Sequence, residues 1–302
     1  MLTLADSAIS LKTNRYVFTN PFDSDKYPLS YSVLYENRLV SLFAPGQFSC
    51  RNVKSWLRDE AMERTLNTYR FDRFWLIDGS LVATSAQKTW RFDAKRGWVS
   101  YAKELPMANG LKMFEDDRYL VYATCNGEFG GRIYFVNKQT QRTHSTESTC
   151  AIWVRRTAEG YEIVSSLGHG VGSAEITLVR APDKLPVVGE SPPAPAIDAN
   201  VVTLFSGTGI QLFGGLVRNN TVYYLTDGPV TTLSTRAGNV FTVVHPLFNE
   251  RLYTHTPVTT NYNGTHLINM DFYGEGGELE VACLLIDADT VTLIDWHTRH
   301  RY

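Results

Sequence analysis

One short unit recurs along the 302-residue chain: an apolar, β-rich run, a tight turn and a second β-rich run. Several of the turns contain Asp-Gly, Asn-Gly or Asn-Asn, residues that tolerate the positive φ angles of two-residue hairpins. Successive turns are separated by 42, 38, 43, 60 and 44 residues. The pattern therefore predicts an all-β fold of six repeated hairpins, whose turns begin near Glu36, Asp78, Asp116, Glu159, Asn219 and Asn263.

Two further strands follow the hairpin in most of the units. They read KTWRF and GWVSY in the second unit, and RIYFV and TQRTHST in the third. Four short strands about every 40 residues are typical of a propeller blade, and the chain resembles the β-propeller superfamily over roughly residues 8 to 298. The resemblance implies a single β-propeller domain, residues 1–302, of about six four-stranded blades. Five or seven blades and a β-sandwich are the alternative folds.

The resemblance to β-propellers is architectural and implies no functional family. The repeated Trp-Asp pair, the kelch double glycine and the sialidase box Ser-x-Asp-x-Gly-x-Thr-Trp do not occur in the sequence. The usual motifs of serine hydrolases, zincins and P-loop NTPases, G-x-S-x-G, H-E-x-x-H and the phosphate-binding loop, are missing too. We therefore assign no catalytic residue from the sequence.

Three segments depart from the repeat. Residues 53–66 place apolar side chains near helical spacing with charges between them, which predicts one short peripheral helix. Residues 181–200 contain five prolines, which a central strand does not accommodate, so we expect an inserted surface loop there. The strands at residues 8–12 and 15–19 are expected to join the last blade or to complete the first, because closing the ring removes exposed sheet edges.

Charge and cysteine usage bear on partners and compartment. A net charge of −2 provides no electrostatic footprint for a phosphate backbone, so we expect no nucleic-acid partner. The first ten residues lack the pattern of a secretory signal, and no apolar run approaches the roughly 20 residues of a membrane helix. The four cysteines are widely spaced without a C-x-x-C motif, which predicts four reduced thiols and no zinc site. We expect a cytoplasmic protein without a membrane partner, metal or cofactor.

Propeller geometry sorts the loops onto two faces. Loops between the second and third strands share a face with the connections between blades, and three of them, residues 126–131, 168–173 and 273–278, are rich in glycine. Glycine lets a backbone approach a ligand closely, and loops on a rigid scaffold commonly carry function. With the shorter loop 226–229 they predict a binding face; the simpler alternative is that they are hairpin tips. The candidate binding residues are Asn126, Glu128, Phe129, His169, Asp227, Tyr273, Glu275 and Glu278.

The titratable members of this set suggest two kinds of chemistry. His169 stands between two glycines, and a histidine pKa suits proton transfer or metal binding. Its glycines do not form a phosphate cradle, since a strand follows them instead of a helix. Glu128, Glu275 and Glu278 resemble the paired carboxylates that hydrolyse glycosides, although solvated acidic loops are the commoner explanation.

The sequence favours a non-catalytic binding module over an enzyme. On this interpretation the loop-rich face binds a protein partner or a small ligand, as a scaffold or immunity-type protein would. A glycosidase or lactonase with a central funnel site, and a carbohydrate-binding lectin, are the alternatives. The sequence leaves the oligomeric state open.

Overall fold

A computed structural model describes residues 2–4, 9, 11–22, 28–44, 46–86, 88–102, 105, 110–168, 170–190, 200–249, 251, 252, 254, 257–273 and 279–297. The described elements are strands, apart from one α-helix, α1 (Glu60–Leu66), and two single-turn 3-10 helices, η1 (Gly127–Phe129) and η2 (Pro182–Lys184). The predicted all-β class is therefore confirmed.

All six predicted hairpins are present. Four of the turns contain two consecutive residues with positive φ angles, among them 47° and 61° at Asn219 and Asn220 and 53° and 93° at Asn263 and Gly264. The paired strands are β3 (Pro28–Tyr35) with β4 (Arg38–Phe43), β6 (Arg73–Ile77) with β7 (Ser80–Ser85), β10 (Leu111–Glu115) with β11 (Tyr119–Cys125), β14 (Ala151–Arg156) with β15 (Tyr161–Leu167), β18 (Leu212–Arg218) with β19 (Thr221–Thr226), and β22 (Val258–Tyr262) with β23 (Thr265–Tyr273).

The other strands extend these hairpins into antiparallel meanders. They are β5 (Gln47–Asn52), β8 (Lys88–Asp93), β9 (Gly97–Ser100), β12 (Gly131–Asn137), β13 (Thr143–Glu147), β16 (Ser173–Val179), β17 (Val201–Thr208), β20 (Thr232–Ala237), β21 (Val240–Pro246), β24 (Leu279–Asp287) and β25 (Thr290–His297). At the N-terminus, β1 (Leu2–Leu4) runs parallel to β21, and β2 (Lys12–Thr19) lies next to β25. The second N-terminal strand thus joins the last repeat, one of the two predicted possibilities.

The described strands form five sheets. Four of them have at least four strands, in the orders β6-β7-β8-β9, β10-β11-β12-β13, β1-β21-β20-β19-β18 and β17-β16-β15-β14-β22-β23-β24-β25-β2; the fifth is β3-β4-β5. The arrangement resembles a β-propeller with four blades, and the predicted count of six blades is not confirmed. The nine-stranded sheet arises because β14 and β22 pair in parallel, with Trp153 opposite Thr259.

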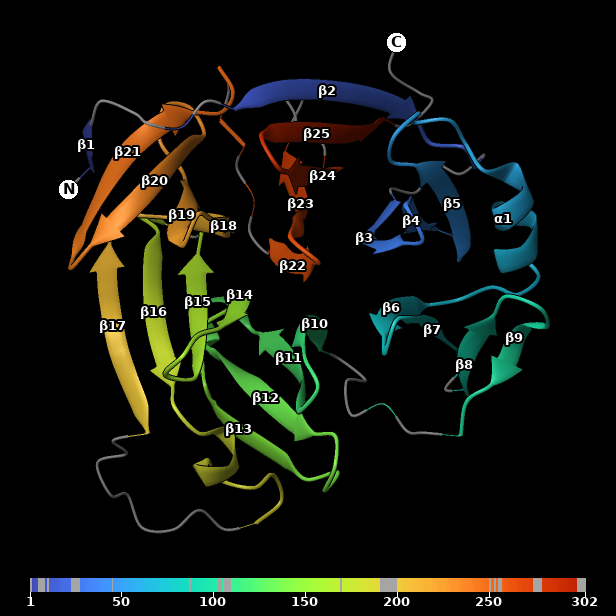
Figure 1. The fold of residues 1–302 in the computed structure, drawn as a ribbon, viewed down its shortest axis with the longest axis horizontal. Helices are drawn as coiled ribbons and strands as arrows, with labels where there is room; N and C mark the ends of the chain where they lie inside the picture. Colours follow the sequence, from blue (N-terminus) through green and yellow to red (C-terminus); the bar gives the residue numbers. More distant parts are fainter. Residues whose placement is uncertain are drawn as a thin grey trace. The chain divides into compact units, whose positions relative to one another are not determined.

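The chain divides into two compact units. Unit 1 comprises Met1–Asn14, Met107–Met270 and Leu285–Thr292, and unit 2 comprises Arg15–Pro106, Asp271–Leu284 and Leu293–Tyr302. In unit 1 the first strands of the successive meanders, β10, β14, β18 and β22, contact one another (Figure 1). Trp153 is buried among them, against Gly215 of β18, where an added Cβ would lie 2.4 Å from its ring. Glycine is required there because the two inner strands approach closely.

Unit 2 contains the predicted helix in a shortened form. Residues 53–59 are not helical, and α1 begins after Asp59, whose side chain accepts a hydrogen bond from the N–H of Met62 as an N-cap. Glu63 fixes the helix to β5: its carboxylate accepts hydrogen bonds from the Cys50 N–H at 2.8 Å and from Arg58 Nε at 2.7 Å. The cap and this anchor, rather than the apolar spacing, decide where the helix begins.

Two of the four cysteines contradict the prediction of reduced thiols. Cys125, at the end of β11, and Cys150, just before β14, form a disulfide. Cys50 and Cys283 are free and buried, and burial raises the pKa of both thiols. Structural disulfides are rare in reducing compartments, so the expectation of a cytoplasmic protein is not confirmed.

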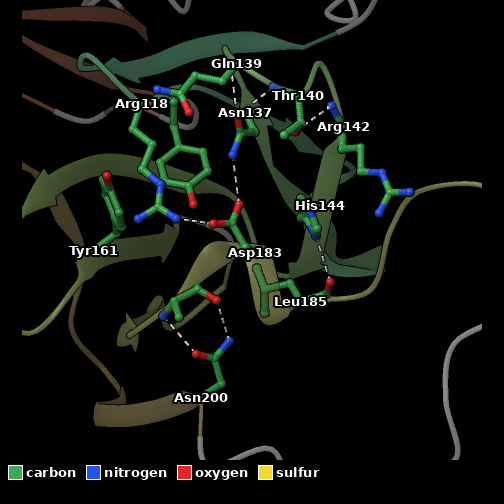
Figure 2. A network of polar contacts seen from close by, with 12 residues as sticks. Arg118, Asn137, Gln139, Thr140, Arg142, His144, Tyr161, Asp183, Leu185 and Asn200 are labelled. Atoms are coloured by element: carbon green, nitrogen blue, oxygen red, sulfur yellow. Dashed lines mark hydrogen bonds and ion pairs between the residues drawn. The ribbon is translucent and has the colours of Figure 1, made fainter.

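Side-chain hydrogen bonds hold the described part of the proline-rich segment. Asp183 of η2 accepts hydrogen bonds from Arg118 and, at 3.1 Å, from Asn137 Nδ2 (Figure 2). The side-chain amide of Asn200 exchanges two hydrogen bonds with the backbone of Ala181, so the two ends of the segment are fixed together. Residues 191–199 lie outside the described residues.

Candidate functional site

The candidate site is one face of unit 1, which we call the loop face and define by the connections 126–130, 148–150, 168–172 and 227–231. The Cys125–Cys150 disulfide joins the loop after β11, a second-to-third strand connection, to the segment that leads into the next meander. The N–H of Ser166, near the end of β15, donates to the carbonyl of Cys150 at 3.1 Å. These bonds place the two kinds of connection on the same face, as the propeller geometry predicts.

The loop 126–130 is held in one conformation by its own backbone and by the disulfide. The N–H of Asn126 donates to the Gly130 carbonyl at 2.8 Å, and Gly127 and Gly130 adopt φ angles of 62° and 85°. A Cβ on Gly131 would lie 2.2 Å from the Thr124 carbonyl oxygen, so only glycine lets the chain leave the loop here. The single turn η1 that results presents Phe129, whose side chain is 86% exposed.

The loop 168–172 is anchored at its base and apolar at its tip. A Cβ on Gly168 would meet the side chain of Gln211, whose amide donates to the Thr254 carbonyl at 2.6 Å. The tip residue Val171 stands between two glycines with positive φ and is 81% exposed. His169 lies outside the described residues.

The shorter loop after β19 carries Asp227, and the structure gives this residue a partner. Its carboxylate accepts hydrogen bonds from Arg251 Nε at 2.8 and 3.0 Å, and its backbone N–H donates to the Gln211 carbonyl at 3.0 Å. Asp227 thereby ties the loop to Gln211 and Arg251. This is an anchoring role, which the sequence could not reveal because Arg251 lies 24 residues away.

The predicted binding residues are thus brought together only in part. Asn126, Glu128 and Phe129 lie side by side on one loop and are exposed. Tyr273 ends β23, but its side chain is outside the described part, as are Glu275 and Glu278. The sequence analysis did not select Val171. Its position between two glycines was the available signal, because it places an apolar residue in a loop and not in a core strand.

Two general features of the described residues bear on the chemistry available. No three His, Cys, Asp or Glu side chains among them converge as metal ligands would. Within the same residues, no helix is long and apolar enough to cross a membrane. What the loop face does present is two exposed apolar side chains, Phe129 and Val171, on loops that are anchored at their bases.

Comparison with known proteins finds similarity of structure only. No protein family and no curated protein matches the sequence. One similar solved structure is the extracellular domain of a putative one-component system from B. thetaiotaomicron (10% identity, 94% of this chain and 34% of that chain, TM-score 0.44). Another is PorZ, a surface component of the type-IX secretion system of Porphyromonas gingivalis (13% identity, 89% and 33%, TM-score 0.40).

A third similar structure is a protein of unknown function from Bacteroides caccae (12% identity, 85% of this chain and 97% of that chain, TM-score 0.42). The present chain spans about a third of the length of the first two proteins. Similarity at this level assigns neither a family nor a function.

Proposed function

We propose that the protein is a non-catalytic binding module that uses the loop face of unit 1 to bind a protein partner. Phe129 is the anchor residue, and Val171 adds a second apolar contact. Asn126 and Glu128, beside Phe129, supply polar contacts at the rim. His169, Tyr273, Glu275 and Glu278 stay candidate binding residues from the sequence, and the proposal does not rest on them.

The observation that carries the proposal is the exposure of Phe129. A phenylalanine that is 86% exposed forgoes the favourable transfer of its ring from water, about 1.5–3 kcal/mol for a large apolar side chain. Aromatic anchors on rigid elements dominate the energetics of many interfaces. Because the disulfide and the glycine turns already fix this loop, binding would order few additional groups and would lose little conformational entropy.

The proposal is tested by affinity capture followed by measurement with the purified partner. Wild type and Phe129→Ala are immobilised in parallel, and a captured protein is purified and titrated by calorimetry. We expect Phe129→Ala to weaken its affinity at least tenfold, the usual effect of truncating an interface anchor. Val171→Ala should weaken it less, because valine buries a smaller area.

The matched control is Val217→Ala in β18, which removes an exposed apolar side chain (41% exposed) next to the β18–β19 hairpin turn. Equal affinities for wild type and Phe129→Ala would contradict the proposal. So would turnover of a glycoside or lactone panel by the wild-type protein, which would favour the enzyme interpretation.

The proposal includes six blade repeats. Each of the six hairpins begins a meander of at least three strands, and β14–β17 and β22–β25 are two such meanders within the nine-stranded sheet. Among the described residues, the strand pairing between them is the one pair Trp153 with Thr259. An experimental structure in which these meanders form one continuous blade would contradict the count.

A further inference from the structure

A groove of about 700 Å³ lies at the outer edge of the sheet β10–β13, and its Glu147 end borders the loop-face connection 148–150. It is lined by β12 and β13 on one side and by the segment Leu185–Glu190 on the other, with Val201 between. Its volume is in the range of pockets that hold a small molecule or a few peptide residues.

The chain itself shows how this edge binds an extended segment. The N–H of Ser145 donates to the Pro186 carbonyl at 3.0 Å, and the N–H of Val188 donates to the Thr143 carbonyl at 2.9 Å. His144 and Val187 form an antiparallel bridge, and the His144 ring contacts the Leu185 carbonyl at 2.9 Å (Figure 2). The first half of the β13 edge is therefore already occupied by strand addition.

The second half of the edge is open. Pro186 has no N–H with which to return a hydrogen bond to β13, and the residues before it, which would continue along β13 toward Glu147, instead form η2, where the Leu185 N–H donates to the Pro182 carbonyl at 3.0 Å. Since Ser145 N–H points to this edge, so does Glu147 N–H two residues on, by the alternation of a strand. Within the described ranges this N–H has no backbone acceptor.

The charged side chains around the open edge form no ion pair within the described part of the chain. Arg132 lies directly opposite Glu147 in the β12–β13 register, yet its guanidinium bonds only the hydroxyl of buried Ser145, at 3.0 Å. Glu147 and Glu190 are exposed on the groove, and neither has a cationic partner among the residues that the structure describes. Two carboxylates against one guanidinium favour a cationic ligand group at the rim.

We propose that this groove binds an extended peptide segment that carries a lysine or arginine side chain. The segment adds to the open edge of β13 and accepts a hydrogen bond from Glu147 N–H, as Pro186 accepts one from Ser145. Its cationic side chain lies at Glu147 and Glu190, Arg132 donates to a peptide carbonyl, and Tyr134 and Val188 contact its apolar side chains. The argument for this site does not rest on the proposed function, although Glu147 directly precedes the loop-face connection 148–150.

The test uses the full chain labelled with 15N and two blocked pentapeptides, acetyl-Ala-Val-Arg-Val-Ala-amide and its counterpart with Glu in place of Arg. We expect the arginine peptide to shift the amide resonances of Ser145, Glu147 and Val188 in a saturable manner. The glutamate peptide should bind at least tenfold more weakly. No saturable shift at these residues, or equal affinity for the two peptides, would overturn the proposal.

Variants separate the backbone contact from the charge. Glu147→Pro removes both the carboxylate and the N–H, at a sheet edge where proline is tolerated, and should abolish the shifts, whereas the double variant below removes charge alone; unchanged affinity of Glu147→Pro would overturn the proposal. The double variant Glu147→Gln/Glu190→Gln keeps the N–H and should weaken the arginine peptide several-fold. If Glu147→Pro does not fold, unchanged affinity in the double variant overturns the proposal instead. Glu159→Gln, in the exposed β14–β15 turn, is the matched control and should bind like wild type.

Discussion

At the scale of single residues, burial decides which side chains respond to pH. His266 in β23 is 2% exposed, and it lies beside Asn261, whose side-chain nitrogen is 3.3 Å from His266 Nε2, and at the edge of the Trp153 ring. Burial lowers the pKa of His266 below its usual value of 6.5, because the imidazolium would lose its hydration. The folded protein therefore keeps this imidazole neutral at pH values where the unfolded chain already binds a proton.

The lowered pKa of His266 has a fixed sign for stability. The contribution of neutral His266 to the free energy of unfolding should be complete above pH 6.5. It should be lost as the pH falls from 6.5 toward the lower pKa of the folded state, because there the unfolded state binds more protons. Denaturant titrations of wild type and His266→Gln between pH 5 and 8 measure this effect. The variant should lose the part of the slope due to His266; an identical slope in the two proteins would show that His266 does not contribute.

At the scale of elements, local signals predicted what lay within one hairpin. Asn219-Asn220 and Asn263-Gly264 specify their own turn angles, so the strands on either side could be placed from the sequence. The helix α1 was predicted too long, because its start depends on the Asp59 cap and on the anchoring of Glu63 to β5. Pro186 lies in the segment predicted to be an inserted loop, and its carbonyl accepts a hydrogen bond from Ser145 N–H at the edge of β13, a contact that the sequence did not predict.

Contacts between separate elements could not be predicted from the sequence. The Cys125–Cys150 pair spans two strands, and the Asp227–Arg251 pair spans β20 and β21. Neither follows from residue spacing. The sorting of loops onto faces would have placed Cys125 and Cys150 on the same side, and this was the one available signal for the disulfide.

Gly131 lies where the loop 126–130 meets β12, with backbone atoms close on two sides. A Cβ there would lie 2.2 Å from the Thr124 carbonyl oxygen and 2.9 Å from that of Ser148, both backbone atoms that no rotamer change can move. We expect Gly131→Ala to lower the free energy of unfolding by about 3 kcal/mol. The control is Gly228→Ala, whose Cβ would meet only the Val230 carbonyl at 3.4 Å. Equal urea midpoints for the two variants would refute the steric argument.

At the scale of the whole molecule, the disulfide contributes to stability. It closes a loop with a sequence separation of 25, for which the chain-entropy relation gives about 3.5 kcal/mol of stabilisation. The variant Cys125→Ala/Cys150→Ala should have a correspondingly lower urea midpoint of unfolding.

Because Cys50 and Cys283 are the free thiols, protein unfolded without reductant should show two reactive thiols. Four reactive thiols in protein purified from its own source would mean that the bridge does not form there.

The central claim is that the loop face of unit 1, with Phe129 at its tip, is where a protein partner binds. The most direct measurement is photo-crosslinking in the source cell, with a benzophenone amino acid placed at position 129 or, as the control, at position 217. We predict one discrete adduct from position 129, displaced by excess wild-type protein but not by Phe129→Ala, and none from position 217. No adduct from position 129, or the same adduct in equal yield from both positions, would contradict the claim.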